Sequence, residues 1–409
     1  MLEPKSFTEY GSDNPKELFG KFSDIGNEML RRLRNIVTRP GERKPPRAWQ
    51  TTDATKLVGV SPPTFRKILD KNPDLPGVIS VTTSNGRTIK KYTLEAINVL
   101  RDISGTRYIR PTNTQPLVIA VSNLKGGVGK TETSVDLGKK CAIDGLKTLL
   151  IDLDAQGTAT LISSGKIPDL EISYNETITS VLLENPKDIE NVIMQTNFDG
   201  LDIIPANLAI QDCDLLLANS DINKQDTLGS PVSRLKKAIN FIKEQYDVIL
   251  IDCSPNLGWL TLNAIVACDG IIIPIPPNMY DYSSFVAFSG SLRNMFNELP
   301  AKSLTYLRFL LSKHPGNNEA LQMENLMREQ FGRYILSNHM CETVEVAKAA
   351  NEMGTIYDIS KPRGSREAFK RAIRHLDDVN NEIIGNFKDI WRLQSESVST
   401  PNNVQETTT

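Results

Sequence analysis

The segment 125–131, with the sequence KGGVGKT, constrains this chain more than any other part of its sequence. It follows an apolar stretch at 116–121 and precedes a plausible helix at 132–141. A strand, a glycine-rich turn and a helix start form a cradle in which backbone N–H groups approach a phosphate closely. Lys130 adds a positive charge, and the hydroxyl of Thr131 suits a magnesium ion. Lys125 stands at the front of the loop, where a generic phosphate-binding loop accepts any residue.

Two further strand ends carry carboxylates. In 149–157 (LLIDLDAQG) the strand ends at Asp152 and Asp154, which share one side of the strand because they are two residues apart. In 246–255 (YDVILIDCSP) an apolar run leads into Asp252. Loops at the carboxyl ends of parallel strands line one crevice. Asp152 and Asp154 are therefore candidates for positioning an attacking water, and Asp252 for organising a magnesium ion.

Apolar strand candidates alternate with helical patterns from residue 116 onward. Several are nearly uninterrupted runs of Val, Ile and Leu, as expected of parallel strands covered on both faces. The expected strands are 117–121, 148–152, 201–205, 248–252, 270–275 and 306–311. The fold class is therefore α/β, with a mainly parallel sheet in a domain at 115–393. A Ser/Thr/Asn/Gln-rich tail at 394–409 is expected to be disordered.

Residues 1–48 are expected to form an amphipathic helix followed by a basic, proline-rich linker. Apolar residues recur at steps of three and four across 14–37. A helix outside a compact domain has to bury this stripe on a partner or on its own body. We expect a dimer arm, with packing inside the chain as the alternative, and a mobile linker at 39–46.

Residues 49–108 follow the order helix, turn, helix and hairpin. Ser61 is an N-cap before a proline, and Asn85-Gly86 separates two β-rich runs. The order is typical of a winged helix-turn-helix DNA-binding domain, and the second run resembles the wing of MerR-like modules. The candidate DNA contacts in the second helix and the wing are Thr64, Arg66, Lys67, Arg87, Lys90 and Lys91.

Charge is distributed unevenly although the net charge is only −2. Residues 1–110 hold 20 Lys and Arg against 12 Asp and Glu, and the remainder holds 27 against 37. A basic front end suggests that one module meets a polyanion, with a solvated charged helix as the alternative. The five cysteines lack metal-ligand spacing and suggest reduced thiols of a cytosolic protein. No apolar run approaches the ~20 residues that span a bilayer.

Three segments together resemble the ParA branch of the deviant Walker A ATPases: KGGVGKT at 125–131, DLDAQGTAT at 152–160 and VILIDCSPNLG at 248–258. The loop PIPP at 274–277 adds to the resemblance, which covers about residues 116–390. The module in front resembles the large ParA form, in which a helix-turn-helix binds the operator of the partition genes. The chain departs from the family at Ala155, where proline is usual, and at Cys253, where small or apolar residues are frequent. Neither departure removes a reacting group.

The resemblance implies ATP or ADP and Mg²⁺ as cofactors. Lys130 would bind the β- and γ-phosphates, Thr131 and Asp252 would hold the metal, and Asp154 would be the carboxylate linked to hydrolysis. Lys125 would reach the partner's phosphates across a nucleotide-sandwich homodimer. The implied nucleotide-binding set is Lys125, Gly126, Gly127, Val128, Gly129, Lys130, Thr131, Glu132 and Pro276, the last approaching the adenine. The implied catalytic set is Lys125, Lys130, Asp152 and Asp154.

The resemblance also implies a cytoplasmic, nucleoid-associated plasmid partition ATPase. Its slow hydrolysis would be stimulated by a ParB-like centromere-binding partner, and its winged module would bind operator DNA and repress its own genes. Nonspecific binding to bulk chromosomal DNA would use basic residues near the C-terminus, with a solvated basic helix as the alternative. The candidates are Lys348, Arg363, Arg366 and Lys370.

Three other functions remain open at this point. A MinD-like membrane-cycling ATPase needs a C-terminal amphipathic membrane helix, and the polar tail lacks one. A plain repressor would use its nucleotide site only to gate DNA binding. A reductase-like electron carrier needs paired cluster-ligating cysteines, and the cysteine spacing here does not provide them.

Overall fold

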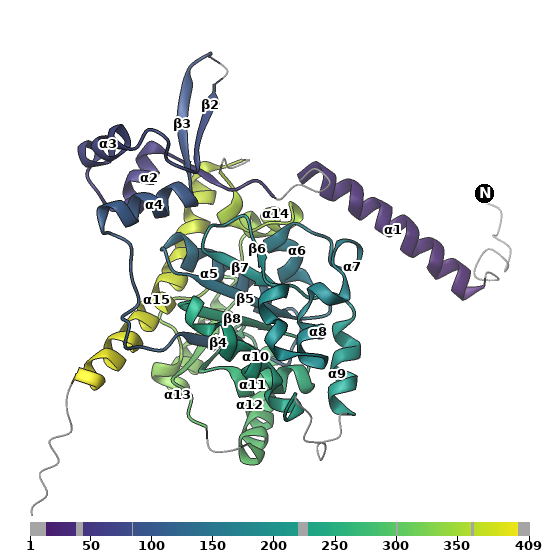
Figure 1. Cartoon of the computed structure of the whole chain (residues 1–409). Helices are drawn as coiled ribbons and strands as arrows, with labels where there is room; N and C mark the ends of the chain where they lie inside the picture. The colour runs from purple at the N-terminus through teal and green to yellow at the C-terminus, as the bar shows by residue number, and fades with distance from the viewer. Residues whose placement is uncertain are drawn as a thin grey trace, which may run out of the picture.

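The computed structural model describes residues 14–37, 44–83, 85–219, 228–299, 302–360 and 364–399. Its body is a three-layer α/β domain, in which helices cover both faces of a seven-stranded sheet (Figure 1). The strand order is β10-β9-β4-β8-β5-β7-β6, and only the β6–β7 pairing is antiparallel. The strands are β4 (Leu117–Val121), β5 (Thr148–Leu153), β6 (Met194–Gln195), β7 (Leu201–Ile204), β8 (Val248–Cys253), β9 (Gly270–Ile275) and β10 (Tyr306–Leu311).

The predicted α/β class and mainly parallel sheet are confirmed. All six expected strands are present within one residue of their predicted ends. The sequence did not indicate β6, because two residues at the edge of a sheet leave no periodic pattern.

Helices and short 3₁₀ segments connect the strands of this domain. The α-helices are α5 (Lys130–Ile143), α6 (Thr158–Ser164), α7 (Pro168–Glu171), α8 (Ile178–Leu183), α9 (Ile210–Ala218), α10 (Arg234–Ile242), α11 (Trp259–Ala267), α12 (Met279–Glu298), α13 (Asn318–Phe331), α14 (Val344–Asn351) and α15 (Arg366–Ser399). The 3₁₀ segments are η2 (Tyr174–Glu176), η3 (Pro186–Val192), η4 (Pro231–Ser233), η5 (Lys243–Gln245), η6 (Gly332–Tyr334) and η7 (Ile356–Asp358).

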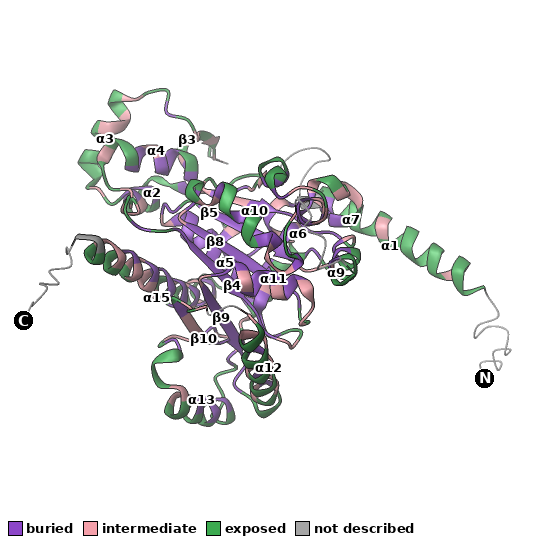
Figure 2. Cartoon of the chain, turned by 60° about the horizontal axis from the view of Figure 1, so that its bottom comes forward, coloured by how far each residue is buried: buried purple, intermediate pink, exposed green. Residues whose placement is uncertain are grey.

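The two faces of the sheet bury separate apolar clusters (Figure 2). Along β4, Leu117, Ile119 and Val121 belong to the cluster under α5 and α15, whereas Val118 and Ala120 belong to the cluster under α8, α10, α11 and α12. This alternation follows from the two-residue period of a strand, and it explains why the strands are apolar at every position.

A smaller unit precedes the sheet domain. It contains β1 (Ala48–Gln50), α2 (Thr51–Val58), α3 (Pro62–Lys71), β2 (Val78–Thr82), β3 (Thr88–Thr93) and α4 (Leu94–Ser104), with β1, β3 and β2 forming one antiparallel sheet. The helices and hairpin therefore lie where the sequence predicted them. Ser61 caps α3 by accepting from the Thr64 N–H, and Phe65 packs edge-to-face on Tyr92, with ring centroids 5.3 Å apart.

This N-terminal unit is packed firmly onto the sheet domain. Its core is continuous with the apolar cluster under α5 and α15. The buried Arg101 of α4 donates to the carbonyl oxygen of Ile143 at the end of α5, at 2.8 Å. Beyond α4, Tyr108 stacks on Trp391 of α15, with centroids 5.9 Å apart. The segment after α4 is therefore itself part of the packed structure.

Helix α1 (Pro15–Val37) matches the amphipathic helix expected at 14–37. It extends away from the body (Figure 1), and its apolar face is exposed at Phe19, Phe22, Ile25 and Met29. Only its C-terminal end contacts the body through a described ion pair, between Arg34 and Glu171. Most of the stripe is therefore uncovered within one chain.

Two predicted boundaries need correction. The linker expected to be mobile reaches into the core at its end, because Lys44 is buried and its ammonium lies 3.1 Å from Asp358; positions 38–43 lie outside the described residues. The tail expected from 394 starts later, since α15 continues through Ser399. The side chain of Gln394 accepts from the Gln115 N–H, so this end of the helix contacts the domain; residues 400–409 lie outside the described part.

Candidate nucleotide site

The segment 122–129 forms a loop between β4 and α5 at the carboxyl edge of the sheet. Gly127 and Gly129 have φ values of 76° and 91°, which only glycine adopts without strain. Asn123 donates to the carbonyl of Pro274 at 2.8 Å, and Ser312 donates to the carbonyl of Val128 at 2.7 Å. Strands β9 and β10 therefore hold both sides of the loop, and its amides are fixed before any anion arrives.

Lys130 opens α5 and is buried beneath the loop. Its ammonium donates to the carbonyl of Lys125 at 2.9 Å, so it spans the concave side of the loop. Burial lowers the pKa of Lys130, and the nearby carboxylate of Asp252 opposes that change. A buried ammonium at the start of a helix is a strong anion site, because the helix N-terminus adds to its charge.

Lys125 takes a different direction. Its ammonium lies 2.7 Å from a carboxylate oxygen of Asp281, in the first turn of α12. The side chain of Lys125 is 38% exposed, whereas that of Asp281 is 10% exposed. Lys125 is therefore held at the partly exposed edge of its own chain's site by an ion pair with Asp281.

Asp252 lies at the end of β8, directly opposite Asp152 in the parallel register. One carboxylate oxygen accepts from the Ser134 hydroxyl at 2.9 Å, and the other is buried with no hydrogen-bond partner among the described residues. Burial and the neighbouring Asp152 raise the pKa of Asp252 above its usual range, while the hydrogen bond from Ser134 opposes the shift. A cation bound beside the free oxygen of Asp252 would favour the charged form of this carboxyl.

Both carboxylate oxygens of Asp152 accept hydrogen bonds from the chain itself, and its catalytic role stays a prediction. One oxygen accepts from the Asp154 N–H at 3.0 Å, and the other accepts from the N–H and hydroxyl of Thr160 at 2.9 and 2.7 Å. Asp152 is fully buried, and both oxygens are engaged with the loop that follows β5. The Asp152 carboxylate thereby holds the backbone of Asp154 in place. The two-residue spacing of Asp152 and Asp154 did not indicate that Thr160 would occupy the second oxygen of Asp152.

Asp154 is partly exposed at the mouth of the site. It lines a cavity of about 240 Å³ together with Ser254, Asn256 and Leu260. The segment 254–258 follows Asp252 and precedes α11, so this cavity joins two loops at adjacent strand ends. Asp154 is therefore the carboxylate of the pair that faces open space.

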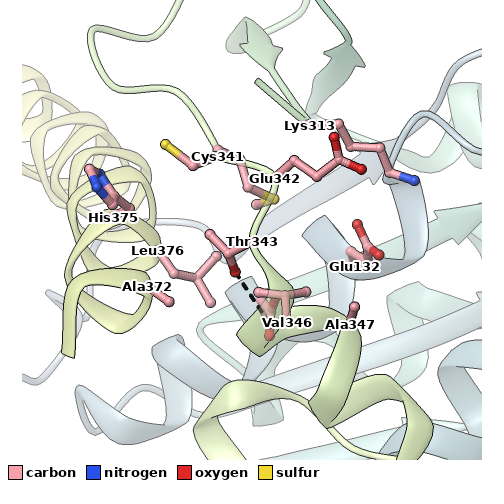
Figure 3. Close-up of a pocket in the computed structure, with 12 residues that line it drawn as sticks. Glu132, Lys313, Cys341, Glu342, Thr343, Val346, Ala347, Ala372, His375 and Leu376 are labelled. Atoms are coloured by element: carbon pink, nitrogen blue, oxygen red, sulfur yellow. Dashed lines mark hydrogen bonds between the residues drawn. The ribbon is translucent and has the colours of Figure 1, made fainter. Parts of the chain in front are cut away.

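A second cavity, of about 200 Å³, opens beside the phosphate loop (Figure 3). Carboxylates of Glu132, Asp136 and Glu342 line it together with Lys313, and α14 and α15 supply apolar walls. A methyl group added at Gly129 would lie 3.5 Å from Glu132 Oε2 and 3.9 Å from Lys313 Cε, so the cavity borders the loop itself. Of these residues, the sequence singled out only Glu132. Lys313 and Glu342 come from distant segments without a motif, and Asp136 lies beyond the loop, within α5.

Pro276, expected near the adenine, follows β9 and does not line this cavity. It is buried, and its carbonyl accepts from the Asn278 N–H at 2.8 Å. The structure therefore gives it a turn between β9 and α12, and its nucleotide contact stays a prediction.

The candidate DNA contacts of the N-terminal unit lie on its surface. Thr64, Arg66 and Lys67 are exposed along α3, on either side of the buried Phe65. Adjacent residues of β3 point to opposite faces, so Lys90 and Lys91 lie on different faces of the hairpin, and their DNA contacts stay predictions. Lys90 is exposed and Lys91 is only partly so.

The basic candidates near the C-terminus gather around α14 and the start of α15. Lys348 pairs with Glu345 at 2.7 Å, Lys370 pairs with Glu367 at 3.4 Å, and Arg366 is exposed. The Lys348 ammonium lies 3.6 Å from a methyl group added at Gly364, so α14 lies close to the segment that precedes α15. Arg363 lies outside the described residues.

The phosphate loop, the strand order and the carboxylates at adjacent strand ends define a P-loop nucleoside triphosphatase. A family model described as "AAA domain" matches residues 117–301. SopA of Escherichia coli K12 is 35% identical over 362 residues, which cover 87% of this chain and 92% of SopA. The chain belongs to the family of ParA-type plasmid partition ATPases.

Solved structures agree with the fold. A partition protein superimposes with a TM-score of 0.60 at 19% identity, covering 83% of this chain and 95% of its own. An ATP complex of a McdA variant from Cyanothece gives a TM-score of 0.55 at 17% identity, covering 66% of this chain and 97% of its own.

Proposed function

We propose that this protein is an ATP- and Mg²⁺-dependent ATPase that segregates plasmid DNA. The observation that carries the proposal is the buried, unpartnered oxygen of Asp252 beneath a preformed phosphate loop. Burial disfavours the charged form of this carboxyl, and a bound cation would favour it. The oxygen donors of Thr131 and Asp252 fit magnesium, which prefers hard oxygen ligands completed by water.

Each part of the site has a role in phosphoryl transfer. Backbone amides of 126–131 and the ammonium of Lys130 hold the β- and γ-phosphates. Lys130 gives up its hydrogen bond to the Lys125 carbonyl when it binds these phosphates. The metal held by Thr131 and Asp252 would supply charge neutralisation on the transferred phosphate. Asp154, at the mouth, positions the attacking water, and Asp152 holds the Asp154 loop.

The cavity beside Gly129 suits the adenosine half of the nucleotide. Ribose hydroxyls and the adenine amino group are hydrogen-bond donors, and the cavity offers carboxylate acceptors between apolar walls. It borders the phosphate loop on the side of Glu132, so one ligand spans both parts.

The proposed active form is a nucleotide-sandwich homodimer. Lys125 is at the rim and partly exposed, so its side chain is free to swing toward a facing subunit once it leaves Asp281. Helix α1, with its exposed apolar stripe, is proposed as a second dimer contact.

Two DNA-binding activities complete the proposal. The unit with α2, α3 and the β2–β3 hairpin acts as a winged helix-turn-helix that binds the operator and represses the partition genes. The basic residues around α14 and α15 bind bulk DNA without sequence preference in the ATP-bound dimer. Binding to bulk DNA would place the protein on the nucleoid, and a ParB-like partner would stimulate hydrolysis and release it.

The membrane-cycling alternative gains no support. That alternative needs an exposed amphipathic helix, whereas α15 packs its apolar side on α5 and Tyr306. Within the described residues, no helix has both the length and the apolar character needed to cross a bilayer. A nucleotide-gated repressor would bind the same nucleotide and the same operator, but it would not hydrolyse ATP repeatedly.

Turnover is therefore the decisive measurement. Lys130→Ala should abolish ATP hydrolysis, because the β- and γ-phosphates lose their buried cation. Lys187→Met, at an exposed lysine of η3, is the matched control and should hydrolyse normally. Partner-stimulated hydrolysis that persists in Lys130→Ala would refute the site. Absence of turnover in the unaltered protein, with DNA and the centromere-binding partner both present, would leave the gated repressor.

A further inference from the structure

Lys313 has no role in binding the β- and γ-phosphates, the metal or the attacking water in the proposed site. It follows β10 at the border of the cavity beside Gly129. Its side chain is half-buried, and no hydrogen bond or ion pair joins it to any residue that the structure describes. A partly buried lysine without a partner leaves its positive charge available to an anionic ligand.

The backbone of Lys313 is also in an unusual conformation. Its φ is 48°, and Met353 is the only other non-glycine residue with a positive φ in the described part of the chain. This region disfavours side chains with a Cβ, so the surrounding structure has to impose it.

The imposing contacts lie on both sides of Lys313. Ser312 is fixed by its N–H bond to the Ile275 carbonyl and its hydroxyl bond to the Val128 carbonyl. His314 is fixed by its N–H bond to Met340 and by accepting from the Glu342 N–H. With both neighbours tied, the left-handed turn directs the Lys313 side chain toward Gly129, where Cε lies 3.9 Å from an added methyl group.

Glu132 and Glu342 line the same cavity, yet neither forms an ion pair with Lys313. Figure 3 shows Lys313, Glu342 and Glu132 converging at the end of the cavity next to the phosphate loop. The cavity thus offers carboxylate acceptors for the hydrogen-bond donors of a nucleoside. It also offers one lysine without an ion-pair partner, at the end of the cavity that borders the phosphate loop.

We propose that Lys313 is a nucleotide-positioning residue whose ammonium binds the phosphate nearest the nucleoside, which ATP and ADP share. The assignment rests on the proposed nucleotide site. Lys130 serves the distal phosphates from the opposite side of the loop, so the two lysines act on different parts of one ligand. Lys313 therefore strengthens binding of ATP and ADP alike and leaves the chemical step unchanged.

The test compares Lys313→Met, which keeps most of the stem, with Lys313→Arg, which keeps the charge. In the full-length chain, Lys313→Met should weaken binding of Mg-ADP and of a non-hydrolysable ATP analogue to the same extent, about tenfold to a hundredfold. KM for ATP should rise with kcat unchanged, and the ADP affinity should depend less on salt. Lys313→Arg should recover most of the affinity.

A structural role for Lys313 predicts a different pattern. Lys313→Asn is the variant that separates the two, because asparagine tolerates a positive φ but carries no charge. It should keep the folded stability of the unaltered protein and lose ADP affinity as Lys313→Met does. Wild-type ADP affinity in Lys313→Asn, or a loss confined to the ATP analogue, would overturn the assignment. Failure of the unaltered protein to bind ADP would instead overturn the proposed nucleotide site.

Discussion

The ammonium of Lys125 and a carboxylate oxygen of Asp281 lie 2.7 Å apart within one chain. Asp281 is buried, and Lys125 is its only ion-pair partner among the described residues. If Lys125 serves a facing subunit, this pair has to break and leave a buried carboxylate behind, which is costly. Asp281→Asn should therefore shift the monomer–dimer equilibrium toward the nucleotide-bound dimer, by up to about tenfold.

Sedimentation with a non-hydrolysable ATP analogue measures this equilibrium. Asparagine keeps the shape of Asp281 next to Asn278, which caps α12 by accepting from the Asp281 N–H. Asp74→Asn, at an exposed residue of the N-terminal unit, is the control. Unchanged or weaker dimerisation of Asp281→Asn would show that the ion pair does not restrain Lys125.

Asp136 makes a prediction about stability and pH. It is fully buried in α5, one oxygen has no hydrogen-bond partner among the described residues, and burial raises its pKa to about 7. A carboxyl whose pKa is higher in the folded state loses its stabilising contribution as pH rises through that value. Asp136→Asn should therefore be more stable than the unaltered protein at pH 8, by about 2–4 kcal/mol.

Urea unfolding at pH 5, 6, 7 and 8 checks the sign. The advantage of Asp136→Asn should grow from pH 5 to pH 7 and then level off. Asp188→Asn, at an exposed position, should show no such trend. A constant difference at all four pH values would mean that Asp136 does not change protonation in this range.

The sequence predicted the phosphate loop and the carboxylates of β5 and β8 because those features are local. An apolar run ending in Asp252 places that residue at the strand end, whatever the rest of the chain does. The contacts of Lys125 with Asp281 and of Lys313 with the loop could not be predicted. They depend on β9 lying beside β4 and on β10 lying beside β9, and strand order leaves no local signal. The hydrogen bonds of Asp152 with Thr160 are local, but no sequence pattern indicated them.

The buried network at Asp358 joins three distant parts of the chain. Its carboxylate contacts Lys139 of α5 at 2.5 Å and Lys44 of the N-terminal segment at 3.1 Å, and these two lysines hold the pKa of Asp358 well below its usual range against the effect of burial. Asp358→Asn leaves two buried ammonium groups without their anion and should destabilise the fold by about 3–5 kcal/mol at pH 7.

Lys139→Met is the informative comparison, because Lys44 remains to neutralise Asp358. Its loss should be smaller, about 1–3 kcal/mol, and the double variant should lose less than the sum of the two. The contribution of Asp358 is present above the unfolded-state pKa and disappears as pH falls through the lower folded value. Equal losses in the two single variants would mean that Lys44 does not share the carboxylate.

The two proposed DNA surfaces are separable by salt and sequence. Lys348→Ala and Arg366→Ala remove charges around α14 and α15, so they should weaken ATP-dependent binding to random DNA. The slope of log affinity against log salt should fall by about one for each lost phosphate contact. Operator binding and ATP turnover should not change, because neither side chain lines the cavity beside Gly129 and neither belongs to α3. Arg66→Ala, on the exposed face of α3, should have the opposite effect: it should abolish the preference for the operator while binding to random DNA persists.

Electrophoretic mobility shifts at several salt concentrations measure the affinity for random DNA and the affinity for the operator. If the Lys348 and Arg366 variants keep the original slope, bulk DNA is bound elsewhere and the basic residues there are simply solvated.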